Sequence, residues 1–179
     1  MTTNNPLVHN LGLPLFNKIT PAHVAPGLEF ILKECNAELE TLESKPGDNW
    51  DSLLLPLERI RRKLQSTWGP VQHLVGVKNS PELRIAYEET LPKIVNFSLR
   101  AAQSKPIFQA LKAMRDSQAW QTLSPGRQRA VENLILSAQL SGIELEGDDQ
   151  KRFNEIQQSI SKLQSSFSNH VLDATKEFE

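Results

Sequence analysis

The sequence predicts an all-α fold, a multi-helix bundle of long amphipathic helices. Apolar residues recur along most of the chain at steps of three and four, the spacing of one face of an α-helix. No segment alternates apolar and polar residues for long enough to indicate a strand, and no Asn-Gly or Asp-Gly pair joins two such segments. Hydrophobic residues make up 39% of the chain and aromatic residues 6%, which suits helices with wide polar faces better than a sheet core.

Proline after a capping residue marks three helix starts, at Thr20-Pro21, Ser80-Pro81 and Ser124-Pro125. Proline fits the first helical position because the N–H there has no partner within the helix, and the Ser or Thr before it can accept from the free N–H groups. The first helix is predicted to begin at Pro21 and to end before the turn residues 45–48. Its predicted buried face consists of Val24, Leu28, Ile31, Leu32, Cys35, Leu39 and Leu42.

A second helical pattern runs from Leu53 to Trp68, with Pro56 tolerated in the first turn. Gly69-Pro70 is expected to interrupt this helix. Residues 71–78 then form either a short separate helix or a kinked continuation of the second one.

The third helix begins at Pro81 and contains Pro92, where we expect a kink because proline lacks an N–H and crowds the carbonyl one turn earlier. Two shorter helices are predicted over residues 106–118 and 125–141. Gly142 is placed to end the second of them, because glycine readily adopts the left-handed conformation that closes a helix.

The final helix, over about residues 148–176, has the most regular apolar pattern in the chain, a seam of the kind that coiled coils use. The chain then stops at Glu179 with helix-forming residues and no Gly, Asn or Pro, so we expect this helix to be truncated here and to continue in a longer protein. The predicted seam consists of Phe153, Ile156, Ile160, Leu163 and Phe167.

Charge and cysteine content exclude several classes of protein. The net charge of −1 supplies no general field for nucleic acid or an acidic membrane surface. The single cysteine, Cys35, cannot form an internal disulfide, and it is expected to be a small buried hydrophobe. The start of the chain lacks the pattern of a secretory signal, and no apolar run is long enough to span a bilayer. These observations predict a soluble cytoplasmic protein without membrane or nucleic-acid partners.

The histidines do not have the spacing of a zinc peptidase, in which two His four residues apart flank a catalytic Glu. No two of them are four residues apart and none lies in an HExxH sequence, so we expect no catalytic and no metal-binding residue in this chain. The four histidines are His9, His23, His73 and His170.

The segment Val77–Pro92, which reads VKNSPELRIAYEETLP, combines a helix start with an ordered series of charged and aromatic side chains. In physical terms it is a capped start followed by an amphipathic helix. The polar and aromatic side chains near this start are candidates for holding the helix junction. These candidate structural residues are Asn79, Ser80, Glu82, Arg84 and Tyr87.

This segment resembles the N-terminal region of the thimet oligopeptidase family of zinc metallopeptidases, most closely its bacterial oligopeptidase A members. Four further stretches resemble successive parts of the same region, and together they follow the family's order across nearly the whole chain. These stretches are Gly12–Leu28, Trp50–Leu57, Ser141–Ile143 followed by Leu145, and Phe153–Thr175 with its sequence SNHVLDAT.

The resemblance implies a large cytoplasmic enzyme that hydrolyses short peptides in a deep channel with zinc on its floor. Residues 1–179 would be its N-terminal helical domain, with an extended arm at about 1–19 and a helical body at about 20–179. The HExxH helix and a downstream Glu ligand belong to a C-terminal catalytic domain that would follow residue 179. This chain would form a channel wall that selects substrates sterically, and would itself bind no zinc and be inactive in isolation.

Two other interpretations are open. In the first, the chain is a free-standing helical interaction module that uses the seam Phe153–Phe167 to bind a partner helix or to dimerise. In the second, a basic cluster at residues 59–63 binds nucleic acid. Arg59, Arg61, Arg62 and Lys63 alternate with apolar residues at helical spacing and no aromatics lie among them, so a solvated helix face is favoured over that role.

Overall fold

The computed structural model describes residues 4–8 and 12–178, and within these residues it is helical with no strand. The all-α prediction is therefore confirmed. The α-helices are α1 (Pro21–Ser44), α2 (Leu55–Val77), α3 (Pro81–Ala102), α4 (Lys105–Arg115), α5 (Pro125–Leu140) and α6 (Gly147–Glu177). Three short helical turns accompany them, namely η1 (Phe16–Lys18), the π-helical η2 (Trp50–Leu54) and η3 (Gln118–Thr122).

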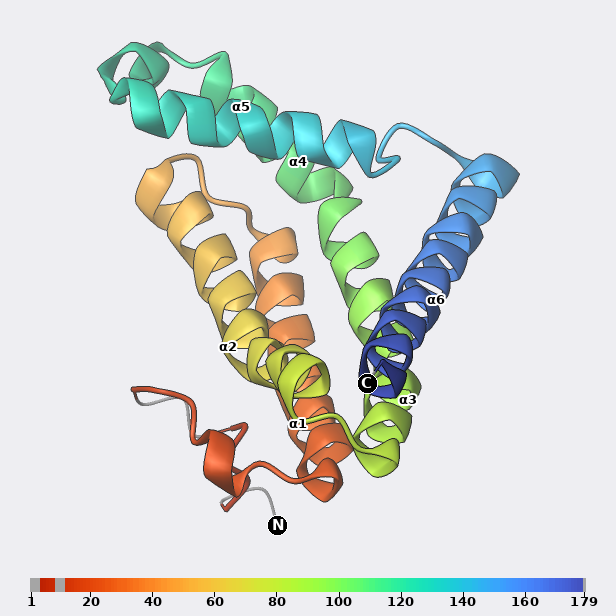
Figure 1. Cartoon of the computed structure of the whole chain (residues 1–179). Coiled ribbons are helices and arrows are strands. Elements are labelled where there is room, and N and C mark those ends of the chain that lie inside the picture. Colours follow the sequence, from red (N-terminus) through yellow and green to blue (C-terminus); the bar gives the residue numbers. More distant parts are fainter. Residues whose placement is uncertain (1–3, 9–11, 179) are drawn as a thin grey trace.

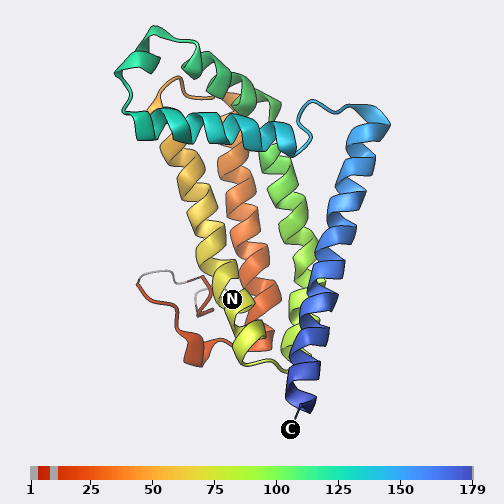
Figure 2. The same cartoon turned by 45° about the horizontal axis from the view of Figure 1, so that its top comes forward.

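Three long helices form the body of the molecule (Figure 1). α1, α2 and α3 run alongside one another with alternating direction, and α1 contacts both of the others. α4 and α5 pair with each other and lie across one end of this body, as Figure 2 shows from above. α6 returns along α3 in the opposite direction, so its C-terminal end lies near the beginning of α3. No helix among the described residues is long and apolar enough to cross a membrane.

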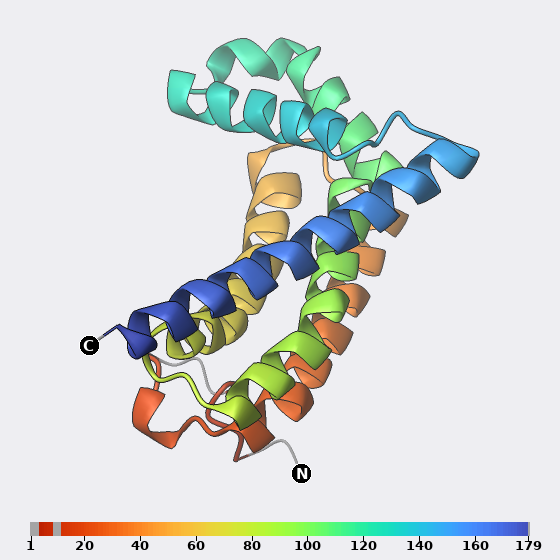
Figure 3. The same ribbon diagram turned by 45° about the vertical axis from the view of Figure 1, so that its right-hand side comes forward.

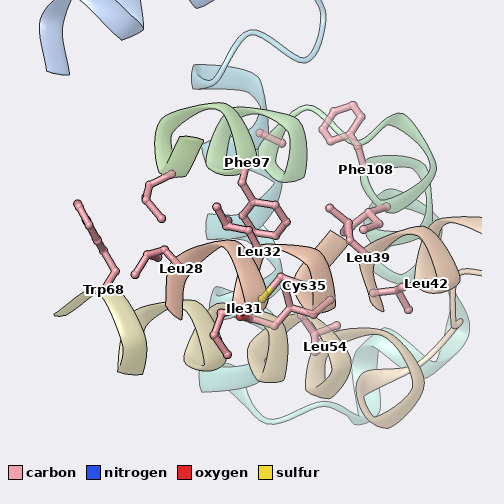
Figure 4. Packing of buried hydrophobic residues seen from close by; sticks show 14 of the residues in the cluster. Leu28, Ile31, Leu32, Cys35, Leu39, Leu42, Leu54, Trp68, Phe97 and Phe108 are labelled. Carbon is pink, nitrogen blue, oxygen red and sulfur yellow. Dashed lines mark hydrogen bonds between the residues drawn. The ribbon is translucent and has the colours of Figure 1, made fainter. Parts of the chain in front are cut away.

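The core is built around the apolar face of α1, whose predicted residues are all buried. Figure 4 shows Leu28, Leu32, Cys35 and Leu39 facing residues of the neighbouring helices. Removing such a leucine from water stabilises the fold by about 1.5–3 kcal/mol per side chain. Burial raises the pKa of the Cys35 thiol to about 11, which fits the predicted small hydrophobe rather than a nucleophile.

The predicted helix starts and stops agree closely with the structure. Pro21, Pro81 and Pro125 each occupy the first position of a helix. Gly142 follows α5 with a φ of +79°, a left-handed conformation that side chains with a Cβ rarely adopt. At these four positions the proline and glycine signals therefore identified helix boundaries correctly.

The expected interruption at Gly69-Pro70 is wrong, because α2 continues through both residues to Val77. Of the two alternatives for residues 71–78, the structure adopts the continuation of the second helix, and a kink in it stays a prediction. Trp68, Pro70 and Val71 are all buried against neighbouring elements, and that burial outweighs the loss of one backbone hydrogen bond at proline. α3 likewise continues through Pro92, and a kink there stays a prediction.

In the N-terminal arm, expected to be extended over about residues 1–19, the described residues include a turn and a short helix. Residues 4–8 form a turn that places Leu7 in the core, and η1 follows before α1. Asn5 Nδ2 donates to the carbonyl of His23 over 2.8 Å, and Thr67 Oγ1 on α2 donates to the carbonyl of Leu7 over 3.1 Å. Two hydrogen bonds between residues distant in sequence, together with buried Leu7, therefore hold this arm against α1 and α2. Residues 1–3 and 9–11 of the arm lie outside the described residues.

Candidate functional site

The turn between α2 and α3 is organised by the side chains of Asn79 and Ser80. Ser80 is the N-cap of α3, and its hydroxyl accepts a hydrogen bond from the N–H of Leu83 over 3.2 Å. Asn79 Nδ2 donates to the carbonyl of Val75 in the last turn of α2 over 2.9 Å. Asn79 therefore hydrogen-bonds to a carbonyl at the end of α2, and Ser80 accepts from an N–H at the beginning of α3.

Arg84 connects this turn to α6. Its Nε donates to Asn79 Oδ1 over 2.6 Å, and its Nη1 donates to Asp173 Oδ2 over 2.7 Å, while its Nη2 bonds to the other carboxylate oxygen. The guanidinium matches the carboxylate with two parallel hydrogen bonds. These bonds lower the pKa of Asp173 and raise the pKa of Arg84. A single side chain therefore joins the α2–α3 turn, α3 and α6.

The other two candidates lie at the edges of this junction. Glu82 is exposed in the first turn of α3, where its own backbone N–H and the Ser80 hydroxyl hydrogen-bond to the carboxylate and lower its pKa. Tyr87 points toward α2, where its ring stacks on Trp68 with centroids 4.7 Å apart. Burial raises the pKa of the Tyr87 phenol. Asn79, Ser80 and Arg84 therefore converge, while Tyr87 contributes to a separate aromatic contact.

The pairing of α3 with α6 continues beyond Arg84 as a series of polar contacts, which sequence reasoning missed. A signal existed, because the polar residues Asn154, Gln158, Asn169 and Asp173 recur at helical spacing on one side of the last helix. In the series, Asn169 Nδ2 donates to Glu88 over 2.8 Å, Gln158 Nε2 to Asn96 over 2.6 Å, and Gln103 Nε2 to Asn154 over 2.7 Å.

A groove of about 680 Å³ lies between α3 and α6 beside this series. Its walls mix both signs of charge with hydroxyl, amide and apolar groups. It is lined by Pro81, Arg84, Ile85, Glu88, Leu91, Lys162, Ser165, Ser166, Asn169, His170 and Asp173.

The histidines are dispersed over the fold. His23 lies at the start of α1, where its Nδ1 accepts from the N–H of Thr20 over 3.1 Å. His73 lies on α2 beside the ring of Phe16, and His170 lies in the groove on α6. His9 falls outside the described residues. Within the part of the chain that the structure describes, no three His, Cys, Asp or Glu residues gather to hold a metal ion.

Two of the four basic residues in the cluster on α2, Arg61 and Lys63, pair with carboxylates. Lys63 Nζ reaches across to α1, lying 3.0 Å from Glu34 and also bonding to Glu38. Arg61 Nε pairs with Glu58 one turn earlier over 2.9 Å. Carboxylates thus neutralise part of the cluster's charge, and its three arginines are exposed. Both observations agree with the solvated helix face that the sequence favoured.

Comparison with known proteins connects this helical architecture to a family. The family described as neurolysin/thimet oligopeptidase, N-terminal domain, matches residues 28–150. A probable cytosolic oligopeptidase A of Arabidopsis thaliana is 48% identical over 177 residues, which is 99% of this chain and 25% of that protein.

Two bacterial oligopeptidases are also similar to nearly the whole of this chain. Oligopeptidase A of Haemophilus influenzae is 38% identical over 179 residues, covering 100% of this chain and 26% of that protein. Oligopeptidase A of Escherichia coli is 38% identical over 172 residues, covering 96% of this chain and 25% of that protein. The chain thus spans about a quarter of the length of these relatives. It belongs to the neurolysin/thimet oligopeptidase N-terminal domain family.

Proposed function

We propose that this chain is the N-terminal helical domain of a zinc-dependent oligopeptidase that hydrolyses short peptides in the cytoplasm. The observation that carries the proposal is the similarity, continuous over 99% of this chain, to a probable cytosolic oligopeptidase A four times as long. Similarity of that extent favours the same place in a larger polypeptide. In this proposal the domain comprises residues 1–179, and the catalytic domain follows it.

The zinc of such an enzyme does not fit the residues described in this chain. A zinc peptidase uses His and carboxylate ligands that converge within about 2.0–2.2 Å of the metal. His23, His73 and His170 lie on different elements, and no ligand cluster forms among the described residues. In this proposal the metal and the hydrolysis itself belong to the remainder of the polypeptide.

The contribution proposed for this domain is steric and polar selection of the substrate. The layer of α1, α2 and α3 supplies a rigid wall, and the groove between α3 and α6 exposes donors and acceptors along one side of it. An extended peptide can exchange hydrogen bonds with such a surface, whereas a folded protein cannot enter a narrow channel. Its partners are then short peptides and its own catalytic domain.

The peptidase activity is tested with the longer polypeptide and the 179-residue chain in parallel. Unstructured peptides of about 5–15 residues are the substrates, since chains of that length lack a stable fold. We expect chelator-sensitive hydrolysis by the longer polypeptide and none by the 179-residue chain. Chelator-sensitive turnover by the rigorously purified 179-residue chain would overturn the assignment of the chemistry to the catalytic domain.

The groove is tested by reversing the charge of Lys162, which forms no ion pair with any other described residue. Lys162→Glu in the longer polypeptide is expected to raise KM for acidic peptides about two- to tenfold with little change in kcat. Lys176→Glu, near the end of α6 and outside the groove, is the matched control. Equal kinetics for the two variants would remove the groove from the proposed role.

A second candidate function is a free-standing interaction module, because the predicted seam on α6 is exposed in large part. Light scattering on the 179-residue chain separates the two candidates. A stable oligomer that dissociates on substitution of Leu163 would favour the interaction module.

A further inference from the structure

α6 differs from every other α-helix in how it is attached to the fold. None of its residues, all of which the structure describes, is buried, and no apolar side chain of α6 packs against the core cluster. Hydrogen bonds and the ion pair of Arg84 with Asp173 join it to α3. A helix with apolar residues at regular spacing normally buries the face that they form. The apolar face of α6 is not buried by its contact with α3.

The apolar side of α6 faces away from α3. A helix turns by about 100° per residue, so the seam side chains at 156, 160, 163, 167 and 171 share one side, opposite the polar side chains that bond to α3. Leu163 and Phe167 are 69% and 70% exposed, and Ile156, Ile160 and Val171 are exposed as well. Figure 3 shows α6 crossing the outside of the three-helix body with one side free.

The first seam residue shows where the covered part of this face begins. Phe153 is half-buried, and its ring lies 3.3 Å from the position that a Cβ on Gly142 would occupy. Glycine at this point therefore lets the ring pack on the α5–α6 connection. Beyond Phe153, the seam has no neighbour within the described part of the chain that buries it.

The family match indicates what covers the seam. The match to the N-terminal domain ends at residue 150, in the first turn of α6. Similarity to the oligopeptidases continues through α6, and those proteins are about four times as long as this chain. α6 is thus shared with the longer enzymes although nearly all of it lies beyond the N-terminal domain match.

A second copy of the chain fits the seam less well. Two-stranded coiled coils require apolar heptads sustained over about three to four repeats. The exposed seam from Ile156 to Val171 covers 16 residues, slightly more than two heptads. A broader apolar surface offers more contact to this short stripe than a single partner helix does.

We infer that the exposed seam of α6, formed by Ile156, Ile160, Leu163, Phe167 and Val171, is the docking surface for an apolar face of the polypeptide that follows the N-terminal domain in the longer peptidase. The inference rests on the proposed function, since it requires that larger polypeptide. α6 is then a connecting helix, with its polar side on α3 and its apolar side on the remainder of the enzyme.

Cysteine accessibility tests this surface. Leu163→Cys and, separately, Phe167→Cys are introduced into the longer polypeptide and into the 179-residue chain, and alkylation is followed by mass spectrometry of the modified peptide. Ser168→Cys, exposed on the same helix but outside the seam, is the control. Cys35 adds little background because it is buried and its pKa is raised to about 11.

We expect the seam cysteines to react at least about tenfold more slowly in the longer polypeptide than in the 179-residue chain, with the control cysteine unchanged within about twofold. Equal rates for the seam cysteines in the two proteins would overturn the inference. Slow reaction already in the 179-residue chain, together with a dimer by light scattering, would also overturn it in favour of a second copy. Hydroxyl-radical footprinting of the unsubstituted proteins at Leu163 and Phe167 gives the same comparison if a variant fails to fold.

Peptide hydrolysis by the same preparations separates this inference from the proposed function. Protection of the seam without hydrolysis would support the docking surface and count against the peptidase activity. Hydrolysis with an unprotected seam would support the activity and overturn the docking surface.

Discussion

α1 and α6 are both long amphipathic helices, yet they relate to the molecule in opposite ways. α1, which packs against α2 and α3, buries eight of its 24 residues, whereas α6 buries none of its 31 residues, all of them described. Both have apolar side chains at helical spacing, so amphipathicity alone does not place a helix in a core. The difference lies in which side faces the neighbouring helix, apolar for α1 and polar for α6.

Different interactions hold the two helices in place, and these interactions differ in how much they stabilise the fold. Burial of apolar area supplies most of the free energy that holds α1, because each buried leucine contributes about 1.5–3 kcal/mol. Hydrogen bonds at the surface exchange for bonds to water and contribute much less. α1 should therefore behave as part of one cooperative unit with α2 and α3, and α6 should open locally before that unit unfolds.

The largest expected effect on the free energy of unfolding comes from truncating a buried leucine side chain in the core. Leu28→Ala should lower the free energy of unfolding by about 2–5 kcal/mol, because the buried side chain leaves a cavity that its neighbours fill incompletely. Leu163→Ala on α6 is the matched control and should change it by less than about 0.5 kcal/mol. Urea denaturation of the 179-residue chain measures both values. Similar losses for the two variants would contradict the contrast between α1 and α6.

A smaller effect is expected where the N-terminal arm meets α2. Thr67→Val keeps the shape of the side chain but removes the hydroxyl that donates to the carbonyl of buried Leu7, at a cost of about 1–3 kcal/mol. Urea denaturation gives the change, and hydrogen exchange should show faster exchange at the Leu7 amide. A Thr67→Val chain as stable as the unsubstituted one would show that the arm does not depend on this bond.

Removal of the Arg84 side chain should loosen α6 and leave the core intact. In Arg84→Gln the bidentate bonds to Asp173 are lost, so amide exchange in the C-terminal half of α6 should rise about three- to tenfold while exchange in α1 is unchanged. Arg61→Gln breaks a pair within α2 and is the control. Faster exchange spread evenly over α1 and α6 would mean that the helices form one unit.

The smallest effect is expected on the contact between Arg84 and Asp173 when the pH is lowered. Hydrogen bonds from Arg84 lower the pKa of Asp173, so its contribution to the α3–α6 contact is fully present above the unfolded value of about 3.9 and is lost as pH falls through the lower folded-state pKa. NMR titration of the Asp173 carboxyl should therefore give a pKa below that in the Arg84→Gln variant. The same pKa in both proteins would contradict the pairing.

Local signals in the sequence predicted the helices well because those signals act within one or two turns. Proline at Pro21, Pro81 and Pro125 and glycine at Gly142 mark boundaries that depend on backbone geometry alone. Gly69-Pro70 carried the same local signal and gave the wrong result. There the buried contacts of Trp68 and Val71 with other elements decide the outcome, and those contacts are long-range.

The candidate junction was predicted only in part for the same reason. Ser80 could be identified as a cap from its place before Pro81, but the partner of Arg84 lies 89 residues away in sequence. Helical spacing places Asp173 on one side of α6 with Asn169, but nothing local identifies Arg84 as its partner. The polar series that joins α3 to α6 therefore required the fold to bring the two helices together.

By itself the sequence determined the all-α class, the approximate helix boundaries, the buried face of α1 and the resemblance that led to the family. These depend on periodicity and backbone chemistry, which are properties of short segments. The tertiary structure alone decided which side of α6 meets a neighbour. α6 has an apolar and a polar side, and packing on α3 uses the polar one because its side chains find complementary donors and acceptors there.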